Sequence, residues 1–418
     1  MEKMWFQEKR SAWMLLSILW FIAFSGKLSR FVMAVFQVQI ADDFHIARSL
    51  VAGAWSTNLL ITAFCAPIGG MLVDKYGAKK VLILSSLFNI VGAAVVCLSS
   101  GPIWFYVGYG VISGFAGIGA STSYVLLFQW FKHHRGKATA ILTSASSIGL
   151  AICTPIFVSN TWLTWQDAFL VTAVLGLITT LPLFIVAMRT PDETAKPSQA
   201  AANPADKTKK PKKQGVGLAN FLKHPLLFII SLALFTCGFN MGTVEMNLVT
   251  IHQINEVSPA VIAFVMSLLG IMEITGVFAY GYVLDRMNKN MVMALLYTVR
   301  IAAFFVLFLH LSWSPHVFAI LFGITYLSAI PGGLLIANDA FEEKGKATGI
   351  LIMFHQAGGI IGALVSGIFY DMFGNYQMLL ILNGALCVLV ACGYYMTNKA
   401  NFAKRKFTTS SARETSQA

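Results

Sequence analysis

Twelve apolar runs dominate this sequence, and they constrain its fold more than any other feature. Each is long enough to cross a hydrocarbon core of about 30 Å as a helix. Because bare backbone cannot face lipid, a spanning segment is a helix or part of a closed barrel, and runs this continuously apolar are helices. We therefore predict an all-α membrane protein with twelve transmembrane helices, at 12–38, 50–71, 80–99, 103–130, 138–159, 165–188, 225–250, 258–283, 290–311, 316–337, 347–369 and 376–397.

The charged residues agree with this count. Only 11% of the chain is charged, whereas a soluble domain carries about 25%. If the N-terminus is cytoplasmic, the cytoplasmic connections hold nearly all the loop Lys and Arg, as the positive-inside rule requires. This predicts a multi-pass protein of the plasma or inner membrane with both termini in the cytoplasm. It also accounts for the net charge of +12, so no nucleic-acid partner is expected.

Motifs for catalysis and for metal or nucleotide binding are missing from the sequence. The six cysteines are scattered through apolar runs without C-x-x-C spacing, which favours apolar packing over disulfides or metal ligation. There is no Walker A motif and no nucleophile–base pattern. We therefore expect no enzymatic activity, no metal and no cofactor.

Two pairs of similar segments reveal an internal duplication. RGKATAIL at 135–142 returns as KGKATGIL at 344–351, and GMLVDKYGAKK at 70–80 returns as GYVLDRMNKN at 281–290. The two offsets are nearly equal, which indicates two six-helix halves repeated in parallel, an architecture found in secondary transporters. The predicted organisation is an N-terminal bundle at 1–190, a basic cytoplasmic linker at 191–220, a C-terminal bundle at 221–398 and a cytoplasmic tail at 399–418. A regulatory or lipid-headgroup role for the linker is the alternative to a plain tether.

GMLVDKYGAKK resembles the G-x-x-x-D-[RK]-x-G-x-[RK]-[RK] signature of the major facilitator superfamily at every fixed position. The resemblance implies a gating motif on the cytoplasmic face, in which the Asp caps the N-terminus of a helix in the other half. In the second copy Asn288 replaces the second Gly. Topology determination is the alternative role for the cations. The expected gating residues are Gly70, Asp74, Lys75, Gly77, Lys79, Lys80, Asp285 and Arg286.

Within this superfamily the chain resembles the monocarboxylate porters and the neighbouring oxalate–formate exchangers. The similarity is carried by ADDFHIARSLVAGAWS, WFKHHRGKATAI and GIFYDMFGNY. It implies transport of small carboxylates, with a proton or in exchange for another anion. Two positions depart from that pattern. The family's substrate-linked Lys aligns near Phe31, and the Arg expected four residues after the acid Glu273 is Val277.

Five charged residues fall inside apolar runs, where each costs about 2.5–3.5 kcal/mol and tends to be functional. Lys27 and Arg30 lie three residues apart in the first run and so share one helix face. They could receive a carboxylate, with Arg30 as a bidentate fork. The alternatives are structural pairing of both cations with Glu245 or Glu273, or an outward-snorkelling Arg30.

The two intramembrane acids are candidates for proton coupling. A carboxyl in a low-dielectric cavity has its charged form disfavoured, so Glu273 and Glu245 could each carry a proton; a static ion pair is the alternative. Arg300 could either bind substrate or neutralise Glu273. His355 and Gln356 are expected to contact substrate or to form helix–helix hydrogen bonds, and Asn240 is a further substrate-binding candidate.

Together these features predict a monomeric secondary transporter that moves a small organic anion by alternating access. Its expected partners are the lipid bilayer, a small-molecule substrate, and a proton or counter-anion. The main alternative is proton-driven efflux of a hydrophobic or cationic compound, favoured by the loss of the second-half Arg. A non-transporting membrane sensor built on the same scaffold is the alternative from another class.

Overall fold

A computed structural model describes residues 10–119, 122–131, 135–160, 162–180, 225–340 and 344–414. Every element in these ranges is a helix, and ten of the described helices are long and apolar enough to cross a membrane. The fourth and sixth predicted spans are occupied by consecutive shorter helical segments. The predicted all-α membrane fold is therefore confirmed.

The first half of the chain supplies six spans. The fourth is broken into several segments because its glycine-rich sequence allows close approach to α2: a Cβ at Gly117 would lie 2.5 Å from the Thr62 backbone. The helices are α1 (Arg10–Asp43), α2 (Arg48–Tyr76), α3 (Ala78–Cys97), the fourth span α4 (Pro102–Phe105), η2 (Tyr106–Ile112), α5 (Ser113–Phe115), η3 (Ala116–Gly119) and α6 (Thr122–Trp130), then α7 (Arg135–Ser159), and the sixth span α8 (Trp165–Leu175) with η4 (Gly176–Thr180).

The second half repeats this order, with its fourth span divided between two helices. The helices are α10 (Pro225–Ile254), α11 (Pro259–Arg286), α12 (Lys289–Phe308), α13 (Ser314–Tyr326), α14 (Ala329–Ala340), α15 (Lys344–Phe373) and α16 (Gln377–Glu414). α16 continues beyond the predicted end of the last span, because the sequence after Gly393 contains no Gly or Pro that would stop a helix. The predicted linker, residues 191–220, lies outside the described residues, so its boundaries stay a prediction.

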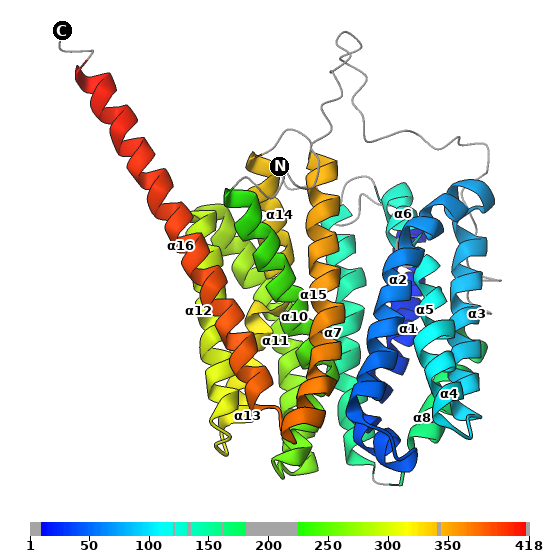
Figure 1. The fold of residues 1–418 in the computed structure, drawn as a ribbon. Coiled ribbons are helices and arrows are strands. Elements are labelled where there is room, and N and C mark those ends of the chain that lie inside the picture. The colour runs from blue at the N-terminus through cyan, green and yellow to red at the C-terminus, as the bar shows by residue number, and fades with distance from the viewer. Residues whose placement is uncertain are drawn as a thin grey trace.

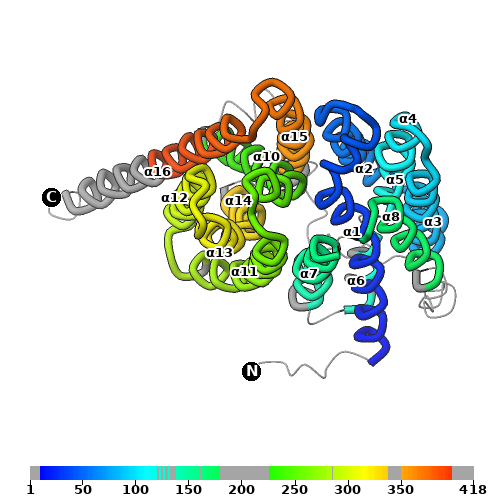
Figure 2. The backbone as a smooth tube through the Cα atoms, turned by 90° about the horizontal axis from the view of Figure 1, so that it is seen from below, coloured from blue at the N-terminus to red at the C-terminus, as the bar shows by residue number. Residues whose placement is uncertain are grey.

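The two halves form separate bundles that meet along two helix pairs. Figures 1 and 2 show α2 beside α15 and α7 beside α11, and these pairs make the main contacts between the first bundle (α1 to η4) and the second bundle (α10 to α16). Inside the second bundle α10 and α15 touch backbone to backbone, since a Cβ at Gly238 would lie 1.9 Å from the carbonyl oxygen of His355. This contact fixes His355 and its neighbours against α10.

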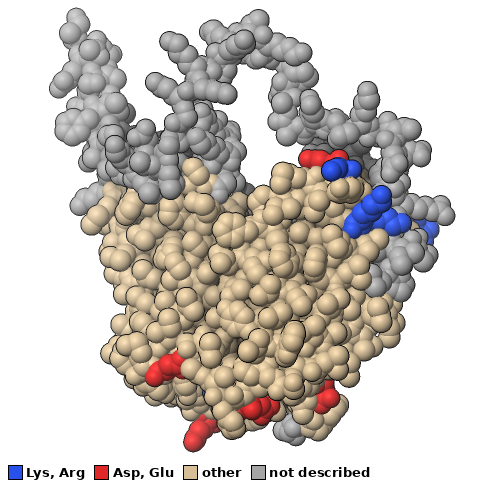
Figure 3. Space-filling view, turned by 45° about the vertical axis from the view of Figure 1, so that its right-hand side comes forward, with Lys and Arg blue, Asp and Glu red and all other residues tan. Residues whose placement is uncertain are grey.

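Charge divides the molecule into two ends, which we call the basic side and the acidic side. Acidic side chains dominate one end of the surface in Figure 3, and the Lys and Arg side chains in view lie at the other. This is the segregation that the positive-inside rule predicts. The basic side, where α2 meets α3 and α11 meets α12, carries Lys75, Lys79, Lys80, Arg286 and Lys289; the acidic side carries Asp42, Asp43, Asp167, Glu256 and Asp371.

Candidate functional site

A cavity of about 740 Å³ lies between the two bundles. Most of its lining residues come from the middle of the spans or from the halves near the basic side, such as Leu82, Leu142 and Ile352. A smaller space of about 40 Å³ adjoins it and shares Lys27, Arg30 and other lining residues. The cavity therefore faces the basic side.

On the acidic side the bundles are held together by contacts between α2 and α15. The Asp371 carboxylate accepts the backbone N–H groups of Arg48 (3.0 Å) and Ser49 (2.9 Å). These N–H groups begin α2 and have no partner within that helix. Ser56 Oγ donates to the carbonyl oxygen of Ile360 at 3.0 Å. The structure therefore has its bundles closed on the acidic side and parted on the basic side.

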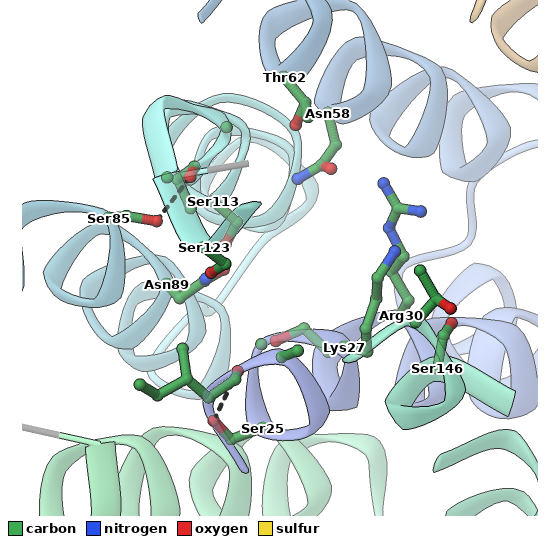
Figure 4. A pocket seen from close by; sticks show the side chains of 18 of the residues that line it. Ser25, Lys27, Arg30, Asn58, Thr62, Ser85, Asn89, Ser113, Ser123 and Ser146 are labelled. Atoms are coloured by element: carbon green, nitrogen blue, oxygen red, sulfur yellow. Dashed lines mark hydrogen bonds between the residues drawn. The ribbon is translucent and has the colours of Figure 1, made fainter. Parts of the chain in front are cut away.

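Lys27 and Arg30 both line the cavity. They extend in the same direction from α1 in Figure 4. Arg30 Nη1 lies 3.7 Å from Glu245 Oε2, an ion pair that joins the first bundle to the second. Lys27 forms no ion pair with any side chain that the structure describes. The cavity thus holds one paired and one unpaired cation.

Glu245 lies where both bundles meet the cavity. The Tyr326 hydroxyl donates to Glu245 Oε1 at 2.5 Å, while the other carboxylate oxygen faces Arg30. The side chains of Arg30 and Glu245 are 22% and 35% exposed. Both therefore remain reachable from the cavity, so a small molecule that enters it can compete with Glu245 for the guanidinium.

Glu273 is the second carboxyl of the cavity, and its surroundings differ from those of Glu245. It is 3% exposed, and Ser147 Oγ of α7 donates to its Oε2 at 2.5 Å. This bond crosses between the bundles, because Glu273 belongs to α11. Among the described side chains no cation lies in salt-bridge distance of Glu273, so it is not neutralised by Arg300.

His355 and Gln356 of α15 both line the cavity. His355 Nδ1 lies 3.2 Å from the carbonyl oxygen of Leu234, a helix–helix contact with α10. Gln356 makes no hydrogen bond to the described residues. Its amide is the freer of the two groups to contact a ligand.

Arg300 and Asn240 lie in the core of the second bundle and do not line the cavity. Both are 0% exposed. Arg300 donates to the carbonyl oxygens of Thr325 (2.9 Å) and Tyr326 (3.1 Å) and to Asn240 Oδ1 (3.3 Å). Asn240 also donates to Asn383 Oδ1 at 2.8 Å. This geometry gives no support to substrate binding by either residue, and we drop both from the site.

The expected gating motif lies on the basic side, at the end of α2. Gly77 takes a positive φ of 83°, which ends α2 and starts α3. Asp74 is exposed and makes no ion pair or hydrogen bond to a described side chain. Arg286 packs over the Tyr282 ring, and the Asp285 side chain lies outside the described residues. The gating role of this motif stays a prediction, because the bundles are parted where it lies.

Sequence reasoning missed two parts of the site. It included Asp371 only within the GIFYDMFGNY segment and did not expect this side chain to bind the start of α2. It also overlooked the hydroxyl and amide groups of the first bundle that line the cavity. Their i, i+3 and i, i+4 spacing on α3 and α7 is the signal that could have found them: Ser85, Ser86, Asn89, Thr143, Ser146 and Ser147.

Comparisons with known proteins agree with this architecture. The family model of the Major Facilitator Superfamily matches residues 19–341 and 230–414. An uncharacterized MFS-type transporter of Bacillus subtilis, YcxA, is 26% identical over 91% of this chain and 92% of its own length. Monocarboxylate transporter 12 of Xenopus laevis is 22% identical over 90% and 89%, and monocarboxylate transporter 4 of Rattus norvegicus is 23% identical over 90% and 80%.

Solved structures share the fold at lower identity. The nucleoside transporter NupG has a TM-score of 0.75 at 16% identity and covers 94% of this chain and 100% of its own. A bacterial homolog of the human lysosomal transporter Spinster, in an inward-facing and unoccupied conformation, has a TM-score of 0.65 at 13% identity and covers 94% and 98%. With two parallel bundles, a cavity between them and a family model that matches nearly the whole chain, this protein belongs to the major facilitator superfamily of membrane transporters.

Proposed function

We propose that this transporter moves small organic anions of the monocarboxylate kind by alternating access, with proton coupling. The observation that carries the proposal is Arg30, a guanidinium that reaches the cavity from α1 and whose one ion pair among the described side chains is with the half-buried carboxylate of Glu245. A carboxylate ligand can replace Glu245 with a bidentate, charge-assisted contact. The adjacent Lys27 adds a second positive charge for the same ligand.

The arrangement of the bundles supports alternating access. The cavity faces the basic side, and the positive-inside rule places that side in the cytoplasm. We propose a monomer in the plasma or inner membrane with both termini cytoplasmic, seen in its inward-facing state. In the outward-facing state the contacts of Asp371 with α2 must break, and the gating residues Asp74 and Asp285 would come within reach of the opposite bundle.

Coupling follows from the competition for Arg30. With no substrate, the charged Glu245 neutralises Arg30 across the bundle interface. When a carboxylate binds Arg30, the displaced Glu245 loses its counter-charge in a cavity wall, where an unpaired charge is costly. Taking up a proton removes that cost. We therefore assign Glu245 to proton coupling linked to the substrate, and Glu273 to a second proton site at the Ser147 contact.

The names of the relatives support the substrate class. The monocarboxylate transporters that match this chain do so over most of its length. The cavity lining also weighs against an efflux pump for hydrophobic cations, because its two carboxylates are balanced by two cations and its wall is rich in hydroxyl groups.

Uptake into proteoliposomes tests the proposal. Purified protein is reconstituted, an inward proton gradient is imposed, and uptake of labelled lactate, pyruvate and longer carboxylates is followed against protein-free liposomes. We expect uptake above the internal concentration, which a protonophore abolishes. If no carboxylate enters while lipophilic cations are driven against a proton gradient, the anion proposal is wrong and efflux takes its place.

Asp371→Ala should shift the protein away from the inward-facing state. The change removes both acceptors that cap the start of α2, a loss of about 0.5–2 kcal/mol, which corresponds to roughly a 2- to 30-fold shift in the ratio of the two states. The measurement is the labelling rate of Ser56→Cys by a membrane-impermeant maleimide added from the acidic side. Ser56 is buried at the α2–α15 contact, so labelling should accelerate.

The same Asp371→Ala chain without Ser56→Cys corrects for labelling of the native cysteines. Asp371→Asn is the graded comparison, because its amide keeps one acceptor oxygen. An unchanged labelling rate in Asp371→Ala would show that other contacts hold the acidic side closed.

A further inference from the structure

Polar side chains from several helices line the same cavity as Lys27 and Arg30. Figure 4 shows Asn58, Ser85, Asn89, Ser123 and Ser146 around the same space as the two cations. These groups come from α2, α3, α6 and α7, so four separate helices turn polar side chains toward one volume. A short aliphatic acid needs a cation for its carboxylate and apolar surface for the rest, and it would use none of these groups.

Several of these groups are set up to accept hydrogen bonds. Ser85 Oγ donates its one hydrogen to the carbonyl oxygen of Ala116 at 2.6 Å, and Asn58 Nδ2 donates to the carbonyl oxygen of Tyr109 at 2.8 Å. The Ser85 lone pairs and Asn58 Oδ1 are left as acceptors. A ligand that carries O–H donors would complement these acceptors.

Other lining groups make no hydrogen bond within the described part of the chain. These groups are Asn89, Ser123 and Ser146. In a cavity that is open on the basic side, these groups are accessible to water. When the bundles close around a ligand, that water has to be replaced by equivalent partners, since a buried polar group left without one costs about 1–3 kcal/mol.

The volume of the cavity also favours a ligand larger than a short aliphatic acid. At about 740 Å³ the open cavity has room for a ligand larger than a three-carbon acid, since ligand sites typically measure roughly 300–1,000 Å³. A ligand that fills it from Arg30 to Asn89 has to extend from the cations on α1 across to α3. Its far end then lies among hydroxyl and amide groups.

We propose that the preferred substrate is a polyhydroxylated carboxylate of the sugar-acid class, with its carboxylate on Arg30 and Lys27 and its hydroxyl groups on Asn58, Ser85 and Asn89. The inference rests on the proposed function, because it takes Arg30 as the anion site. It narrows that function from small organic anions in general to acids that carry several alcohol groups.

Calorimetric titration of the purified full chain in detergent tests this assignment. Gluconate and hexanoate form a matched pair, with the same carboxylate and carbon chain but with and without hydroxyl groups. We expect the Kd for gluconate to be at least 10-fold lower than that for hexanoate. Equal Kd values, or tighter binding of hexanoate, would overturn the inference and leave the organic-anion function standing. Binding of neither acid would also overturn the inference, and uptake of lactate or pyruvate into proteoliposomes would then decide the organic-anion function on its own.

Two variants test whether polar side chains of the cavity bind the hydroxyl groups of the substrate. Asn89→Leu and Ser146→Ala should each reduce the preference for gluconate over hexanoate several-fold. Arg30→Gln should instead weaken both acids and leave their ratio nearly unchanged. Ser146→Ala deletes a single oxygen and so guards against misfolding of the larger substitution. If neither Asn89→Leu nor Ser146→Ala changes the ratio of the two Kd values, the polar side chains of the cavity do not select the substrate and the inference is wrong.

Discussion

Arg30→Gln is expected to lower carboxylate uptake by roughly 10- to 100-fold. Gln keeps a polar side chain but is two bonds shorter than Arg, and it offers a neutral amide in place of the charged guanidinium. A hydrogen bond to a charged group contributes about 1.5–3 kcal/mol, and each 1.4 kcal/mol is a factor of about 10 in affinity. The loss should appear mainly as a raised KM for proton-driven uptake in proteoliposomes.

The comparison variants separate a binding role from a structural one. Arg30→Lys keeps the charge without the bidentate geometry and should lose less activity than Arg30→Gln. Lys27→Gln tests the neighbouring cation, which lacks an ion-pair partner among the described side chains, and should also raise KM. Thermal unfolding in detergent should be similar in all three, because Glu245 keeps its bond from Tyr326. Uptake by Arg30→Gln equal to that of the wild type would remove Arg30 from the site.

The general architecture could be predicted from the sequence because lipid imposes few solutions. An apolar run of about 20 residues has to be a helix, and the repeated RGKATAIL and GMLVDKYGAKK segments fix the register of the two halves. Lys27, Arg30, Glu245, Glu273, His355 and Gln356 were selected as rare polar groups in these runs, and all of them line the cavity.

The same rule selected Asn240 and Arg300, which lie in the core of the second bundle. The cost of burying a charge identifies a residue that must have partners, but it does not say whether those partners are protein or ligand. For Arg300 the partners are the carbonyl oxygens of Thr325 and Tyr326, on a helix that begins 14 residues further along the chain. No local pattern specifies that contact, because it depends on how α12 is rotated against α13.

The contacts that join the two bundles were also beyond sequence reasoning. The Asp371 bonds to α2 link residues more than 300 positions apart, and nothing in either segment marks them as partners. The hydroxyl and amide groups that line the cavity were not predicted, for another reason. Single Ser, Thr and Asn residues are inexpensive in a membrane helix and common at helix–helix contacts, so only their convergence on one cavity gives them meaning.

Glu245→Gln is expected to abolish proton-driven accumulation while leaving substrate exchange intact. The amide resembles a permanently protonated carboxyl and can still accept the bond from Tyr326. It cannot neutralise Arg30, so the guanidinium stays available for a carboxylate without proton uptake. With a proton gradient of one pH unit, a coupled one-to-one symporter accumulates its substrate about 10-fold, and the variant should reach no more than equal concentrations on both sides.

Counterflow is the matched measurement, because it needs binding and bundle movement but no net proton transfer. Glu245→Gln should exchange labelled for unlabelled carboxylate at a rate that depends less on pH than the wild-type rate. Glu273→Gln provides the comparison, since Glu273 lines the same cavity and contacts Ser147 instead of Arg30. If accumulation survives in Glu245→Gln and is lost only in Glu273→Gln, the proton travels on Glu273, and the competition between substrate and Glu245 for Arg30 is not the coupling step.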